Sequence, residues 1–119
     1  MIEKIVYDYA TNQLPIPVFM ELPEVPSENY PRLPDEFVVI EKVGGSSTNK
    51  IRFASIAVQS YSLRSLYNAS VVNEAVKHVM ECLPANVDDV SDCRLTADTN
   101  FTDTRTKRYR YQCVFSLYY

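Results

Sequence analysis

The first stretch of the chain alternates apolar and polar residues with the period of an α-helix. Its apolar positions fall three and four residues apart, at Ile2, Ile5, Val6 and Tyr9. This spacing predicts an amphipathic helix over residues 2–13. Pro15 and Pro17 follow, and because proline lacks a backbone N–H they exclude further helix there.

A second helical pattern begins near residue 65. Its apolar positions again recur at three and four, at Leu66, Ala69, Val72, Val76, Val79, Met80 and Leu83. Ser62 or Ser65 can cap the first turn with a side-chain hydroxyl, and Pro84 is expected to end the helix. The pattern predicts a helix that lies with one face on a sheet.

Five segments have the composition and alternation of β-strands. They cover residues 18–22, 36–43, 51–61, 94–101 and 107–118. The second and third are separated by a polar stretch that holds both glycines of the chain. We therefore expect an antiparallel hairpin whose turn spans residues 44–49.

The last of these segments alternates strictly. Tyr109, Tyr111, Cys113, Phe115 and Leu117 fall on one side, which we expect to pack beneath the second helix. The element order is α-β-β-β-α-β-β, which predicts an α+β fold with a single mixed or mainly antiparallel sheet and two helices packed on it. A length of 119 residues predicts one domain, residues 1–119.

Proline and charge are unevenly distributed. Six of the seven prolines lie between Pro15 and Pro34, so we interpret residues 23–35 as a stiff Pro-rich arm or loop. Residues 21–41 carry six acids and one base, whereas residues 94–110 carry five bases and two acids. Such opposite poles are either an ordinary solvated surface pattern or a means of attracting one copy head-to-tail onto the next.

Catalytic and metal-binding patterns do not emerge. His78 is the only histidine, and the three cysteines, Cys82, Cys93 and Cys113, are widely spaced, which favours free thiols over a disulfide framework or zinc site. Gly44 and Gly45 lack the spacing of a phosphate-binding loop. We expect no catalytic residue, cofactor or metal. No apolar run reaches the length of about 18 residues that spans a bilayer, and the acidic N-terminus differs from a signal peptide, so we expect a soluble cytosolic protein.

The run KRYRY at residues 107–111 interleaves bases with aromatic rings, as single-stranded nucleic-acid sites do. On a strand, however, Tyr109 and Tyr111 face away from Arg108 and Arg110. The whole-chain charge of −3 also disfavours binding to phosphates. We therefore expect the arginines to meet solvent or a neighbouring chain, and no direct recognition of nucleic acid.

From about residue 15 to residue 119 the sequence resembles the small tail-completion proteins of long-tailed bacteriophages and prophages, the tail terminator or head–tail joining family. The resemblance rests on four motifs in order: EKVGG at residues 41–45, QSY at 59–61, NFTD at 100–103 and RYRY at 108–111. None of them encodes a reaction. Their order along most of the chain is what carries the resemblance.

The resemblance implies a structural part without catalysis. Members of the family form a ring, commonly of six, that caps the tail tube and offers a docking surface to the head. The implied partners are copies of the chain itself, the tail tube protein and head connector proteins; the implied location is the tail or neck of the virion, after assembly in the cytoplasm of the bacterial host. No membrane is implied.

The charged poles supply the candidate subunit and tail interface residues. They are Glu24, Glu28, Arg32, Arg105, Lys107, Arg108 and Arg110. The alternatives are another head–tail completion or minor capsid protein, a small ligand-binding or catalytic α+β domain, and a nucleic-acid-binding module. A concave pocket with converging polar groups would favour the ligand-binding domain.

Overall fold

The structure is a computed structural model that describes residues 2–22, 32–48, 51–102 and 108–119. Its elements are α1 (Ile2–Gln13), β1 (Val18–Phe19), β2 (Glu36–Thr48), β3 (Ile51–Ser62), α2 (Leu66–Glu81), α3 (Leu83–Asn86), β4 (Asp92–Asn100) and β5 (Tyr109–Tyr118). The five strands form one sheet in the order β1-β2-β3-β5-β4. Among the strands of the described residues only the short β1 pairs in parallel, so the expected α+β fold with a mainly antiparallel sheet is confirmed.

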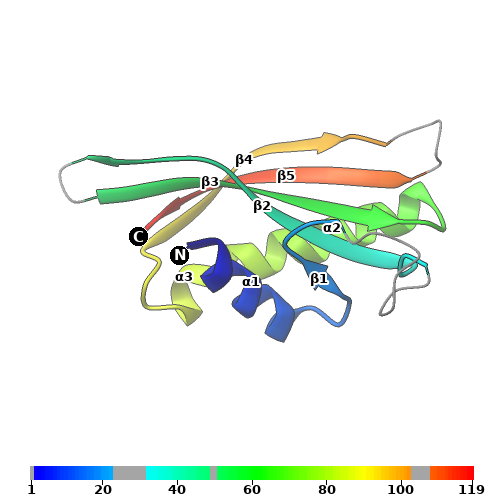
Figure 1. Ribbon diagram of the computed structural model, residues 1–119, viewed down its shortest axis with the longest axis horizontal. Coiled ribbons are helices and arrows are strands. Elements are labelled where there is room, and N and C mark those ends of the chain that lie inside the picture. Colours follow the sequence, from blue (N-terminus) through cyan, green and yellow to red (C-terminus); the bar gives the residue numbers. More distant parts are fainter. Residues whose placement is uncertain (1, 23–31, 49–50, 103–107) are drawn as a thin grey trace.

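The helices lie together against one face of the sheet (Figure 1). The main core forms between them, and its largest members include Val6 from α1, Met80 from α2, and Ile40, Ile56 and Phe115 from the strands. The alternation predicted for the last strand is confirmed for its central part, where Cys113, Phe115 and Leu117 are buried. Burial of such side chains contributes about 1.5–3 kcal/mol each.

The second helix begins as its sequence predicts. Ser65 is the N-cap, and its hydroxyl accepts a hydrogen bond of 3.1 Å from the backbone N–H of Asn68. The helix ends at Glu81, ahead of Pro84, which lies inside the additional short helix α3. Proline is tolerated there because the first N–H groups of a helix have no intrahelical partner.

The hairpin of β2 and β3 is longer than predicted. Strand pairing continues to Thr48 and Ile51, so placing Gly44 and Gly45 in a turn was wrong. Both glycines lie within β2, directly after a register shift between Lys42 and Gly44. A Cβ atom at Gly45 would lie 3.0 Å from the carbonyl oxygen of Phe53, so close backbone approach, rather than chain reversal, explains this glycine.

The two edges of the sheet differ. β1 covers β2 only at Val38 and Val39, because the expected strand over residues 18–22 ends at Phe19. On the other side β4 is the edge strand, and its register against β5 shifts between Leu95 and Ala97. One side of the sheet therefore ends in the short strand β1, which covers a small part of β2, and the other side ends in the bulged strand β4.

A smaller apolar cluster occupies the face of the sheet opposite the helices. It contains Leu33, Phe37, Val39 and Tyr61, and the rings of Phe37 and Tyr61 stack at 4.7 Å. Residues 23–31, most of the predicted Pro-rich arm, lie outside the described residues. None of the described helices is long and apolar enough to cross a membrane.

Candidate functional site: an apolar groove and the opposite sheet edge

A groove of about 510 Å³ opens where the end of α1, the start of β2 and the first turns of α2 meet. Its apolar lining comes from the segment that links α1 to β1 and from one side of α2, including Ile16, Pro17, Val71 and Val72. Val71 is 49% exposed, although it lies on a helix that packs against the core. An exposed apolar surface of this kind is typical of a binding site.

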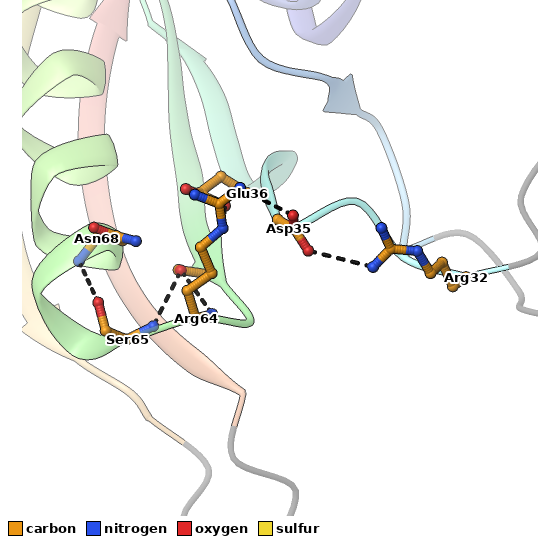
Figure 2. Close-up of polar contacts among 7 residues, drawn as sticks. Arg32, Asp35, Glu36, Arg64, Ser65 and Asn68 are labelled. Atoms are coloured by element: carbon orange, nitrogen blue, oxygen red, sulfur yellow. Dashed lines mark hydrogen bonds and ion pairs between the residues drawn. The ribbon is translucent and has the colours of Figure 1, made fainter.

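Charged side chains line one end of this groove and bind one another (Figure 2). Arg64 donates a hydrogen bond of 3.0 Å from Nη2 to Oδ2 of Asp35, and its Nε lies 3.5 Å from Oε2 of Glu36. Arg32 donates from the outer side to Oδ1 of Asp35 at 3.3 Å. The groove therefore combines an apolar floor with charges that are paired to one another.

These ion pairs fix the charges of the groups involved. The hydrogen bond from Arg64 is the main reason why the pKa of Asp35 lies below its ordinary value. The same hydrogen bond, followed by the nearby carboxylate of Glu36, raises the pKa of Arg64. Neither group is poised to exchange a proton near neutral pH, which general acid–base catalysis requires.

The turn before α2 holds Arg64 in place. The hydroxyl of Ser62 accepts hydrogen bonds from the backbone N–H groups of Arg64 and Ser65, at 3.1 and 3.4 Å. Both serines named as possible caps thus act here: Ser65 caps the helix, and Ser62 closes the turn that precedes it. Arg64 reaches Asp35 and Glu36 from this fixed turn (Figure 2).

A row of aromatic and polar side chains crosses the sheet at the level of the groove. Phe37 of β2 pairs with Tyr61 of β3, and Tyr61 pairs with Arg110 of β5. The guanidinium of Arg110 lies 5.7 Å from the ring centroid of Tyr61 and 5.6 Å from that of Phe101. Nη1 of Arg110 also donates to the hydroxyl of Tyr61 at 3.1 Å. The Arg110 guanidinium therefore contacts two rings, one from the neighbouring strand β3 and one from the residue that follows β4.

The predicted interface residues divide between these two places. Arg32 lies beside the groove, and Arg110 belongs to the aromatic row on the other side of the sheet. Arg108 is half-buried just before β5. Glu24, Glu28, Arg105 and Lys107 lie outside the described residues. Sequence reasoning missed Phe101 and Tyr61 as neighbours of Arg110, because only the strand register brings them together.

A separate polar cluster ties α2 to the edge strand. Asn73, 2% exposed, donates from Nδ2 to Oδ1 of Asp98 at 3.0 Å and accepts from the Cys113 thiol at 3.1 Å. Lys77 donates to the other oxygen of Asp98 at 2.9 Å. Burial raises the pKa of the Cys113 thiol to about 12, and the nearby Asp98 carboxylate adds to this effect. A thiol in that state is not a nucleophile.

Within the described parts of the chain, three or more His, Cys, Asp or Glu side chains do not gather in a way that could hold a metal ion. Comparison of the chain with models of known protein families and with curated proteins finds no match.

Proposed function

We propose that the protein is a structural component of a bacteriophage or prophage tail. In this proposal it forms a ring that caps the tail tube and joins it to the head, and it acts by self-association without catalysis. The observation that carries the proposal is the groove between α1, β2 and α2: its floor is apolar and exposed, and its charges bind one another. Such a surface favours burial against another protein over chemistry on a substrate.

The two unlike sides of the sheet support ring formation. A surface on one side of a protein that meets a different surface on the next copy is a heterologous contact, and it closes into a ring when the rotation between copies allows. The groove lies on the β1–β2 side of the sheet, and the bulged strand β4 forms the other side. The sequence resemblance to tail terminators supports the same assembly, with six copies as the expected number.

Measurement of the assembly state tests this proposal. We expect mass photometry or analytical ultracentrifugation to detect a closed species of about 82 kDa, six times the 13.7 kDa chain, either alone at high concentration or on isolated tails. A protein that stays monomeric at every concentration and does not bind tails contradicts the proposal.

Disruption of the gene separates the two phage functions. Loss of a tail terminator is expected to give tails of abnormal length, because tube growth is no longer stopped. Loss of another head–tail completion protein is expected to leave normal tails and leaking heads. Charge reversal at Glu24 and Glu28, paired with reversal at Arg105 and Arg108, then tests whether the charged poles meet: each single reversal weakens assembly and the combination partly restores it.

A small ligand-binding domain is the second candidate, and the size of the groove favours it. A volume of about 510 Å³ falls within the range of about 300–1,000 Å³ found for ligand pockets. Thermal unfolding in the presence of a metabolite panel tests this alternative. A saturable rise in melting temperature that the substitution Val71→Glu abolishes supports it, and unchanged melting with every compound contradicts it.

A further inference from the structure

Phe101 is an exposed aromatic residue that its neighbours hold in place. It follows β4 directly and is 45% exposed. Its backbone N–H donates to the carbonyl of Arg110 at 2.8 Å, and Nε of Arg110 donates back to its carbonyl at 3.3 Å. The ring packs against the Arg110 guanidinium. On its other side, the Asn100 side chain accepts hydrogen bonds from the backbone and hydroxyl of Thr102.

This arrangement is typical of an anchor residue at a protein interface. The hydrogen bonds fix the backbone at Phe101, and the Arg110 guanidinium contacts its ring. A preorganised aromatic side chain loses little entropy on binding. Aromatic residues are also enriched among the few side chains that dominate binding energy.

The groove and Phe101 lie at the same position along the strands, on opposite sides of the sheet. Glu36, which lines the groove, directly precedes Phe37, and the row of paired residues from Phe37 through Tyr61 and Arg110 leads straight across to Phe101. Three strand spacings separate Phe37 from Phe101, about 14 Å. Two unlike surfaces on opposite sides of one molecule allow a heterologous contact, which gives a ring when the rotation between copies closes.

The two surfaces belong to sequence segments of opposite net charge. Asp35 and Glu36 of the groove belong to residues 21–41, which carry six acids and one base. Phe101 belongs to residues 94–110, with five bases and two acids, and within the described residues Arg110 makes no ion pair with a carboxylate. Opposite charge around an apolar contact favours the correct docking orientation.

We propose that Phe101 of one copy inserts into the groove between α1, β2 and α2 of the next copy. This inference rests on the proposed function, since it names the contact by which the ring closes. The floor of the groove, with Ile16, Pro17 and Val71, receives the ring.

Matched substitutions test each half of the contact. Phe101→Ala is compared with Leu95→Ala, because Leu95 of β4 is 42% exposed but pairs with Phe115, which lies about 17 Å along β5 from Arg110. Val71→Glu is compared with Tyr67→Glu, because Tyr67 is more exposed on the same helix and does not line the groove. Circular dichroism and melting temperature establish that each variant is folded.

We expect Phe101→Ala and Val71→Glu to weaken assembly by roughly 30-fold or more, the effect of losing one buried aromatic anchor, and the two controls to assemble like the parent chain. A photoreactive phenylalanine analogue at position 101 is expected to crosslink to a neighbouring copy within residues 14–17 or 68–75.

Rings that form equally well with Phe101→Ala, or that crosslink elsewhere, overturn this contact but do not contradict ring formation. The contact is also overturned if Val71→Glu still forms rings but no longer binds tails. That result assigns the groove to the contact with the tail. A parent chain that never assembles and never binds tails overturns the proposed function itself.

Discussion

Removal of the Asn73 side chain is the sharpest test of how the edge strand is held. Residues Arg94–Asn100 of β4 are exposed, and Asn73 and Lys77 bind this strand from α2 through the single carboxylate of Asp98. Hydrogen bonds to a charged group contribute about 1.5–3 kcal/mol, and the Cys113 thiol also loses the nearer of its two acceptors, leaving Oδ1 of Asp98 at 3.6 Å. We therefore expect Asn73→Ala to lower the free energy of unfolding by about 2–3 kcal/mol and the melting temperature by about 10 °C.

Urea denaturation at about pH 7 and about pH 3 measures this effect. Burial raises the pKa of Asp98, but the hydrogen bonds from Lys77 and Asn73 outweigh it, and the net pKa lies below the ordinary 3.8. The stabilisation is therefore fully present above pH 3.8 and is lost as the pH falls through the lowered pKa. The difference between parent and variant is expected to shrink in acid. Asn68→Ala, on the same helix, is the control; a loss below about 0.5 kcal/mol at neutral pH for Asn73→Ala refutes the reasoning.

Three further predictions concern the hairpin, the helix cap and the thiols. Gly45→Ala is expected to lower the free energy of unfolding, measured by urea denaturation, by about 1 kcal/mol, because its Cβ would press on the Phe53 carbonyl. Gly44→Ala is expected to be neutral, because a Cβ there meets open space. Equal effects of the two substitutions contradict this explanation. Ser65→Ala is expected to lower the free energy of unfolding by about 1 kcal/mol, because it removes the cap of α2. Ser70→Ala is expected to lower it much less, because the Ser70 hydroxyl only donates to the Tyr67 carbonyl. Burial raises the pKa of both Cys93 and Cys113 to about 12, so both thiols are expected to resist Ellman's reagent at about pH 8 until urea unfolds the chain; fast labelling of either in the native state argues against this.

Local patterns predicted most elements of this fold. The two helices, over residues 2–13 and after Ser65, agree with the structure because their buried side chains recur every three or four residues. The strand from residue 51 agrees because it is a continuous run rich in β-branched and apolar residues. The extent of β2 was not predictable in this way. Gly44 and Gly45 are common in turns, and only pairing with β3 reveals that the strand continues past them.

The candidate site was less accessible to sequence reasoning. The groove joins Ile16, Asp35 and Val71, which are far apart in the sequence and meet only when α1, β2 and α2 pack. Alternation correctly placed Tyr109 and Tyr111 on the face opposite Arg110, yet the rings that contact Arg110 come from β3 and the end of β4. Alternation describes one strand, whereas a surface depends on the register between strands.

The register shift in β4 has a consequence for solubility at high copy number. An exposed edge strand can template the stacking of further chains into fibrils, and a long uninterrupted edge is the most hazardous. In β4 the shift divides the edge into two stretches of four residues, Asp92–Leu95 and Ala97–Asn100, and between them the Thr96 hydroxyl donates to the Val114 carbonyl. Neither stretch matches the six- or seven-residue segments from which amyloid zippers form. The edge of β4 therefore offers no uninterrupted template of that length for cross-β stacking of further chains.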